Sequence, residues 1–370
     1  MQQMNRFTKL MTITMSIAII AVVMIFVLPK IDYFSINSQN LDPGIQSFNK
    51  SIVPLDQIVS GGPPPDGIPS IDNPQFISVK DAENFMTDSD LILGVMVNGD
   101  VRGYPLQILV WHEIVNDIVG ETPIAVTYCP LCFTNQIFNR TLTDGQILEF
   151  GTSGKLYNSN LVMYDRRTNS LWSQAMAQSI AGELAGTDLK RIPFDLATWK
   201  DWKQIFPDSK VLSQDTGHSR PYGADPYGDY YTNPDILFPV SNDDDRLGVK
   251  EIVIGIEENG KSKSYKLQDI EELKVINDKL TENNSITLWS AFPYMVRLFD
   301  PLFDGKTLLN FHYDDKKKVF IDNQTGSEWN FDGKSIEGQL SGSSLLRLPF
   351  DEGFWFEWST FHPDTEVYKR

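Results

Sequence analysis

The chain has 370 residues, of which 41% are hydrophobic and 12% aromatic, a composition that supports two or three folded domains and excludes a mostly disordered chain. Only 2 cysteines are present, so the chain is not a small protein held together by disulfides. The formal net charge of -17 argues against a protein whose main task is to bind nucleic acid, and no nucleotide-binding signature is present.

The N-terminal residues predict a membrane anchor. Residues 10–28 form an apolar run without charge that is long enough to cross a bilayer core. The run exceeds the apolar core of a cleaved signal peptide and lacks a small-residue cleavage site, so we expect residues 1–30 to be a cytoplasmic stub and an uncleaved signal anchor. Arg6 and Lys9 precede the run, which predicts a single-pass cell-membrane protein with its body outside the cytoplasm. A cleaved signal is the alternative, and it would also export the body.

Residues 31–89 are expected to form an extended tether and N-terminal arm. Within them, residues 60–69 read SGGPPPDGIP. Prolines lack an amide donor and glycines add chain entropy, so this segment cannot sustain a helix or a central strand.

Two later stretches, residues 90–213 and 250–370, share residue types at a nearly constant spacing. Gly94 and Gly255 lie 161 residues apart, and Trp202 and Trp358 near the other end lie 156 residues apart. We therefore expect a tandem duplication of one unit of about 120 residues, joined by a connector over residues 214–249. The two copies are expected to pack about a pseudo-twofold axis.

The first copy predicts a strand-dominated α+β unit. Residues 91–97 and 101–104 flank an Asn-Gly turn, which is typical of a β-hairpin. Pro105 suits the first turn of a helix, which we expect to run to Asp117, with a second helix over 267–278. Strands are expected at 123–128 and 133–139. A further hairpin is expected at 161–173, and it should recur at 319–329.

The comparison of the two copies separates residues that are expected to maintain the fold from residues that are candidates for a functional site. Residue types kept in both copies are most simply explained by the shared fold; these are Asn116, Asp165, Trp172, Arg191 and Trp202. Residue types present only in the first copy are better candidates for a site. These are His112, Cys129, Cys132 and Met163.

Cys129 and Cys132 stand in the sequence Cys-Pro-Leu-Cys, a spacing that suits soft-metal binding or cycling between dithiol and disulfide. Haem attachment is disfavoured, because Phe133 stands where that motif needs His. With His112 as third ligand and Met163 as a thioether, the set favours copper, with zinc as the second choice. The alternative is a binding module for a small ligand or a partner protein, with a structural disulfide.

Other residues are expected to support the site. Glu113 and Tyr128 would surround the thiols and set their basicity. Ser153 lies in a predicted tight turn near the site. Lys155 and His218 are candidates for the lining of a pocket between the two copies.

Several long strings carry a resemblance to a known family. They are GYPLQILVWHEIVNDIVG, VTYCPLCFTNQIF, FGTSGKLYNSNLVMYDRRTNSLWSQ and FWFEWSTFHPDTEVY. They resemble the prokaryotic domain-of-unknown-function 3179 family over about residues 60–370. The resemblance implies an exported or membrane-anchored protein and carries no established activity. His112, Glu113, Cys129 and Cys132 lie within these strings, and no reaction is assigned by them.

Overall fold

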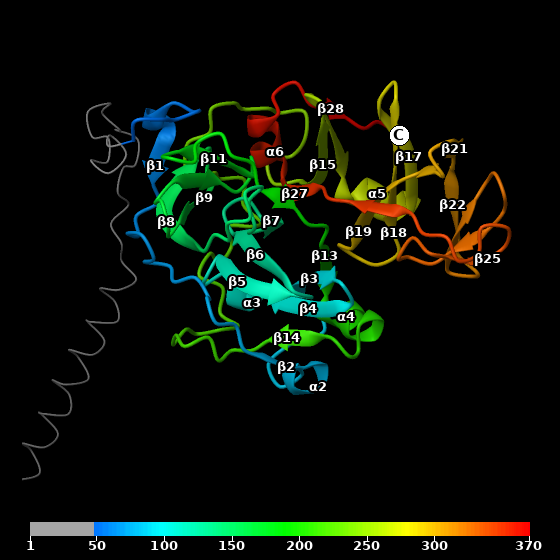
Figure 1. Cartoon of the computed structure of the whole chain (residues 1–370), viewed down its shortest axis with the longest axis horizontal. Helices are drawn as coiled ribbons and strands as arrows, with labels where there is room; N and C mark the ends of the chain where they lie inside the picture. Colours follow the sequence, from blue (N-terminus) through cyan, green and yellow to red (C-terminus); the bar gives the residue numbers. More distant parts are fainter. Residues whose placement is uncertain (1–47) are drawn as a thin grey trace, which may run out of the picture. The chain divides into compact units, whose positions relative to one another are not determined.

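Strands make up most of the regular structure of residues 48–370, the part of the chain that this computed structural model describes (Figure 1). The predicted strand-dominated α+β class is thereby confirmed. The predicted membrane anchor, residues 10–28, lies outside the described residues. Within residues 48–370 no helix is both long enough and apolar enough to span a membrane.

The hairpin predicted around the Asn-Gly turn is confirmed. Asn98 and Gly99 have positive φ angles of 49° and 83°, as hairpin turns of two residues require. The hairpin belongs to a sheet with the order β13-β3-β4-β14-β2. Its strands are β2 (Phe76–Ser78), β3 (Leu91–Val97), β4 (Asp100–Pro105), β13 (Asp195–Thr198) and β14 (Lys210–Leu212).

The helix predicted from Pro105 to Asp117 is wrong beyond its first turn. Helix α3 covers only Leu106–Leu109, and strand β5 occupies Ile114–Val119. Glu113, with a φ of 58°, redirects the chain between the two elements. The β-branched residues of β5 then pack better on a pleated sheet than on a helix. The second predicted helix, 267–278, is also too long, because α5 (Leu267–Leu273) is followed by β17 (Val275–Thr281).

One large sheet runs through both halves of the chain. Its first part is an antiparallel meander that confirms the strands predicted at 123–128 and 133–139. The order is β28-β16-β15-β27-β7-β6-β5, with β12 also paired to β7, and β27 lies beside β7 in Figure 1. The strands not yet given are β6 (Thr122–Cys129), β7 (Thr134–Asn139), β12 (Lys190–Arg191), β15 (Ile252–Glu258), β16 (Lys261–Lys266), β27 (Asp351–Phe354) and β28 (Glu366–Val367).

The remaining sheets are antiparallel, and they include the hairpins predicted at 161–173 and 319–329. One has the order β1-β8-β9-β10-β11, formed by β1 (Ile58–Ser60), β8 (Phe150–Tyr157), β9 (Asn160–Asp165), β10 (Leu171–Ser173) and β11 (Gln178–Ala181). A second comprises β17, β18 (Asn284–Ser290), β19 (Val296–Asp300) and β26 (Leu346–Leu348). A third comprises β22 (Phe311–Asp314), β23 (Val319–Asp322), β24 (Glu328–Trp329) and β25 (Ser335–Glu337).

Short elements complete the described chain. The helices not yet given are the 3-10 turn η1 (Leu55–Gln57), α2 (Val79–Ala82), α4 (Trp199–Ile205) and α6 (Trp355–Phe361). Strands β20 (Leu302–Phe303) and β21 (Thr307–Leu308) form a small ribbon. The proline-rich segment, residues 60–69, lies along β8, where Ile68 O accepts a hydrogen bond from Thr152 Oγ1 at 2.6 Å.

The same strand orders and side-chain hydrogen bonds occur in the two halves of the body. Asn116 bonds both backbone groups of Phe150, and Asn277 bonds both backbone groups of Phe311. Trp172 donates its indole N–H to Asp165, as Trp329 does to Asp322. These polar side chains are mostly buried, and each satisfies backbone or indole groups that would otherwise lack a partner.

A buried carboxylate joins the two halves. Asp195 in β13 receives hydrogen bonds from Arg297 of β19 at 2.8 and 2.9 Å and from Arg347 of β26 at 2.6 Å. Burial alone would raise the pKa of Asp195, but the two guanidinium groups outweigh it and lower the pKa to about 2. The carboxylate is therefore charged in the folded protein at all moderate pH values.

We expect Asp195→Asn to lower the free energy of unfolding by about 3–5 kcal/mol near neutral pH, because it leaves the partly buried Arg347 without an ion-pair partner and the buried Arg297 with only the partly exposed Asp332. The folded-state pKa lies below the ordinary value of 3.8, so this stabilisation is present above about pH 4 and is lost as the pH falls towards about 2. Urea unfolding of the variant and the wild type across this range measures both effects. Glu83→Gln, which removes an exposed ion pair to Lys203, is the control and should change stability little. A variant as stable as the wild type would contradict the assignment.

Candidate functional site

The two cysteines lie in the turn that joins β6 to β7, and both are free thiols. The backbone N–H of Cys132 donates to Cys129 O at 3.2 Å, which closes the turn, and Phe133 leaves it with a φ of 56°. The turn therefore holds both side chains close together. Cys129 is 2% exposed and Cys132 is 0% exposed, so solvent does not reach the pair freely.

The Cys132 thiol is held in its protonated form. Its Sγ donates to Ser159 O at 3.2 Å, in the tight turn between β8 and β9. Burial, and then the neighbouring Cys129 thiol, raise the pKa of Cys132 well above its ordinary value. A reaction of the Cys132 sulfur as a thiolate therefore needs a group that takes its proton.

The second half of the chain completes the surroundings of the thiols. Phe354, the last residue of β27, donates its backbone N–H to Cys132 O at 2.8 Å, and its ring stacks on Phe133. Helix α6 begins directly after it and brings the Glu357 carboxyl to the same place, near both thiols. Glu357 is 4% exposed, and burial raises its pKa well above the ordinary value.

Gly353 leaves the space in which these groups meet. A Cβ atom at this position would lie 2.9 Å from Thr134 Oγ1, 3.2 Å from Cys132 O and 3.3 Å from Glu357 Oε2. These three atoms therefore surround one small volume. Thr134 is the cross-strand partner of Cys129, so their side chains share one face of the sheet.

The connector, residues 214–249, covers the cysteine turn. Tyr230, which is 4% exposed, donates its hydroxyl to Leu131 O at 2.9 Å, inside the turn. The Lys250 ammonium group lies 3.3 Å from the centre of the Tyr230 ring. These contacts seat the tyrosine side chain over the turn and exclude water from it.

His112 does not face the thiols, because both of its ring nitrogens are engaged elsewhere. Nδ1 lies 2.7 Å from Pro69 O, which can only accept, so Nδ1 carries the proton. Nε2 then accepts from the Tyr222 hydroxyl at 2.6 Å. Burial, above all, lowers the pKa of His112 to about 4. The imidazole is thus a neutral anchor for the connector.

The other predicted site residues are spread over the first half. Met163 is fully buried in β9, within the hydrophobic core, and four strand residues, about 13 Å, separate it from Ser159. Ser153 donates its hydroxyl to Val162 O inside the sheet. Lys155 lies in β8 opposite Ser60. The exposed His218 ring lies 5.5 Å from that of His112. The structure thus brings together the two thiols and not the full predicted set.

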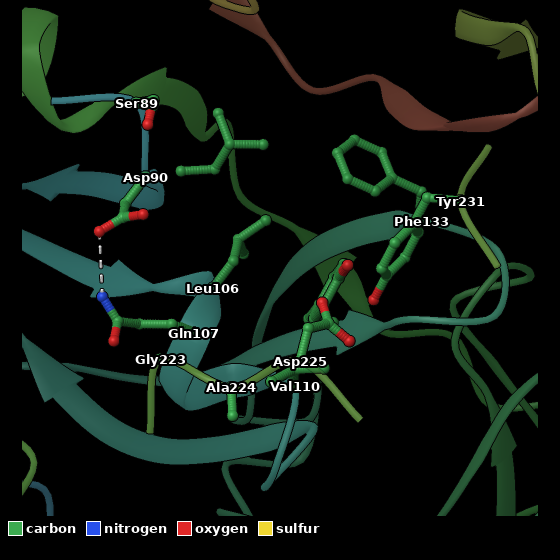
Figure 2. Close-up of a pocket in the computed structure, with 12 residues that line it drawn as sticks. Ser89, Asp90, Leu106, Gln107, Val110, Phe133, Gly223, Ala224, Asp225 and Tyr231 are labelled. Carbon is green, nitrogen blue, oxygen red and sulfur yellow. Dashed lines mark hydrogen bonds between the residues drawn. The ribbon is translucent and has the colours of Figure 1, made fainter. Parts of the chain in front are cut away.

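A pocket of about 310 Å³ lies beside the turn. Tyr128 and Phe133, the residues that bracket the two cysteines, form part of its wall. Figure 2 shows the Phe133 and Tyr231 side chains next to each other on one side, while Gln107 donates to Asp90 at 3.3 Å on the other. The chain neighbours of the two cysteines thus form part of the wall of this pocket, and the cysteines themselves do not line it.

A family model described as a protein of unknown function, DUF3179, matches residues 65–365. The chain belongs to the DUF3179 family. No curated protein and no solved structure matches it. The matched range contains the cysteine turn, the connector and Glu357, so the whole site lies within the DUF3179 region.

The DUF3179 site contains residues that the sequence reasoning missed. Glu357, Gly353 and Phe354 come from the second half, and Tyr230 comes from the connector. Within residues 48–370, no three His, Cys, Asp or Glu side chains are grouped so as to hold a metal ion. One sequence signal could have found Glu357: it stands at the third position of a helix whose N-cap, Phe354, has no side-chain oxygen to pair with it.

Glu113 offers a pH test of the buried DUF3179 site. It precedes β5, and its backbone O accepts from Tyr128 N at 2.9 Å. Burial raises its pKa from 4.5 to about 8, so folding takes up a proton between these pH values. Stability from this group is therefore complete below about pH 4.5 and falls as the pH rises towards about 8.

We expect Glu113→Gln to remove this loss. The variant should be more stable relative to the wild type at about pH 8 than at about pH 5, by about 1.4 kcal/mol for each pH unit crossed. Urea unfolding at both pH values measures the difference. The exposed Glu121→Gln variant, from the turn after β5, is the control. Identical pH dependence in Glu113→Gln and the wild type would contradict a buried neutral carboxyl at this position.

Proposed function

We propose that this DUF3179 body is a thiol–disulfide redox module, with Cys129 and Cys132 as the reactive pair. One observation carries the proposal: two free thiols share one tight turn and touch each other, while the nearest predicted third metal ligand, His112, uses both ring nitrogens elsewhere. The arrangement supports thiol redox chemistry better than the copper or zinc site expected from the sequence, which needs that imidazole.

The reaction is an exchange of one disulfide for another. A thiolate of the pair attacks a disulfide of an oxidised partner, the partner's S–S bond breaks, and one partner thiolate leaves. The second thiol of the pair loses its proton and attacks the mixed disulfide, which forms the Cys129–Cys132 bond and releases the second partner thiolate. The pair is oxidised by two electrons, the partner is reduced by two, and the two thiol protons pass to the partner thiolates or to water.

Access is expected through the pocket beside Tyr128 and Phe133. Its wall is aromatic and its rim carries Asp90 and Asp225, with no basic residue among its lining. A partner that enters it should therefore present a narrow apolar segment rather than an acidic one. Because the thiols are nearly fully buried, the exchange also requires a small displacement of the covering Tyr230.

We also propose that residues 90–213 and 250–370 are two copies of one unit, packed about a pseudo-twofold axis. The equal strand orders and the repeated asparagine and tryptophan hydrogen bonds support this. Reciprocal contacts support it too, since Asp195 pairs with Arg347 and Asp351 pairs with Arg191. In the second copy Ser290 stands where the first has Cys129, so the pair belongs to one copy.

The sequence supports a proposal for the location of the module. We propose that residues 10–28 anchor the chain in the cell membrane, with the body outside the cytoplasm. Disulfides persist in such compartments. A thiol pair that cycles there needs a partner that returns electrons to it, so the proposal includes a thiol-bearing redox partner.

The test uses the full chain in detergent, equilibrated with glutathione buffers of graded potential and then alkylated with a mass-tagged maleimide. We expect both thiols of the wild type to be lost and recovered together and reversibly as the potential changes. Cys129→Ser and Cys132→Ser should each leave one thiol that forms no intramolecular bond. Ser290→Ala, at the corresponding turn of the second half, is the matched control and should behave as the wild type does.

Two outcomes would contradict the redox proposal. In the first, purified protein carries about one equivalent of copper or zinc and its thiols do not exchange with glutathione. In the second, the disulfide forms but is reduced only when the protein unfolds, which would make it a structural bond in a binding module.

A further inference from the structure

The proposed exchange requires a base that accepts the thiol proton, and no residue has yet been assigned this role. The Cys132 thiol is fully buried and donates to a backbone carbonyl, Ser159 O, which cannot take its proton. A thiol is a poor nucleophile until it is deprotonated. A base must therefore lie within the same water-poor space as the pair.

Glu357 is placed to be that base. Its Oε2 and the Thr134 hydroxyl lie within 3.3 Å of one common point, the missing Cβ of Gly353, and the Cys132 carbonyl borders the same volume. The Thr134 side chain is buried and lies within hydrogen-bonding reach of the Glu357 carboxyl, so it connects the Cys129 side of the turn with that carboxyl. The second oxygen, Oε1, is oriented by Asn160 Nδ2 at 3.4 Å.

Glu357 does not have the helix-capping role that is common at its position. Acidic residues at the third position of a helix commonly pair with a Ser or Thr at the N-cap. Helix α4 does this, because Thr198 donates to Asp201 at 2.6 Å and Asp201 N donates back to Thr198 at 3.2 Å. In α6 the N-cap is Phe354, which makes no side-chain cap, so the Glu357 carboxyl is directed towards the thiols instead.

Glu357 interacts electrostatically with charged residues that line a second, open cleft. The charged groups that face Glu357, besides the two thiols, are Asp351 and Arg191. Both line a cleft of about 450 Å³, together with His362 and Asp364. Burial raises the pKa of Asp351, more than Arg191 lowers it, so its carboxyl can carry a proton more readily than a solvated aspartate can.

We propose that Glu357 accepts the proton of the reacting thiol of the Cys129–Cys132 pair and that Asp351 passes it to water in the cleft lined by Arg191 and His362. This inference rests on the proposed redox function and deepens it. The balance is simple: the S–H bond of Cys132 breaks, an O–H bond forms on Glu357, and the sulfur electron pair forms the intramolecular S–S bond as the partner thiolate leaves. Glu357 is a proton-transfer residue and forms no covalent intermediate.

The experiment follows the reaction of the fully reduced full-length chain with dipyridyl disulfide, a small probe whose released thione is measured by absorbance. Rates are taken from mildly acidic to strongly alkaline pH. We expect Glu357→Gln to slow formation of the Cys129–Cys132 bond by about 100-fold near neutral pH, as expected for loss of a positioned base. The loss should shrink at alkaline pH, where hydroxide replaces the carboxylate. Glu357→Asp should recover part of the rate.

Controls separate proton transfer from packing. Asp201→Asn changes the corresponding position of α4 and should leave the rate and its pH profile as in the wild type. In Glu357→Gln, the rate of disulfide formation should change more than the dithiol–disulfide equilibrium in glutathione buffers. If Glu357 had only a structural role, the substitution would not change the pH profile of that rate. Asp351→Asn should slow the reaction by a smaller factor and with the same pH pattern.

The outcomes that overturn the inference differ from those that overturn the redox function. A Glu357→Gln protein that folds and keeps the wild-type rate and pH profile rules out the proton acceptor, while reversible disulfide formation still stands. Should Glu357→Gln fail to fold, an unchanged profile in both Glu357→Asp and Asp351→Asn overturns the inference. A wild type that forms no reversible disulfide with glutathione overturns the redox function itself.

Discussion

The site depends on the point where β27 meets β7. Two strands from distant parts of the chain become neighbours there, and the Phe354 N–H bonds the Cys132 carbonyl at 2.8 Å. This one contact fixes where α6 begins, because Phe354 is also the N-cap of that helix. The helix start then determines that Glu357, one turn later, faces the cysteine turn. Without the junction, the first half would carry two thiols with no acid–base group beside them.

The junction between β27 and β7 also depends on the identity of individual residues. Gly353 must lack a side chain, since any Cβ would collide with the Thr134 hydroxyl, and this absence lets the carboxyl approach the thiol side of the sheet. The ion pairs of Asp195 with Arg297 and Arg347 join β13 to β19 and β26. Both arrangements bury charge, which is tolerated only because each charged group has partners or can be neutralised by a proton.

Local patterns in the sequence were sufficient to predict the hairpins and strands, but they did not predict where the first helix ends. The Asn98-Gly99 turn and the alternating residues around it act within a few positions, so they could be read directly. The chain leaves the helix early because Ile114–Val119 finds a neighbour in β6 and a backbone contact to Ile71, and these partners are distant in sequence. Tertiary pairing outweighed the helical spacing of the apolar residues.

The candidate site was predictable in part, for a similar reason. The cysteine pair is visible as a motif, but His112 was assigned to it on the assumption of a helix that ends at Asp117. Glu357 comes from residues 250–370, and no motif near it in the sequence links it to the cysteine pair. A site assembled from distant parts of the chain cannot be found by asking which residue types one stretch has and another lacks. The unusual N-cap of α6 was the remaining local clue.

The connector has a consequence for how such a chain can vary. Tyr222 is tied to a neutral imidazole and Tyr230 to the carbonyl of Leu131, so the peptide between the two halves is a fitted cover and not a spacer. Its length is therefore constrained by the distance between two anchoring tyrosines. An insertion between them would uncover the sulfurs to oxygen and adventitious metals, while a similar insertion at the solvent-facing tip of the β3–β4 hairpin would be tolerated.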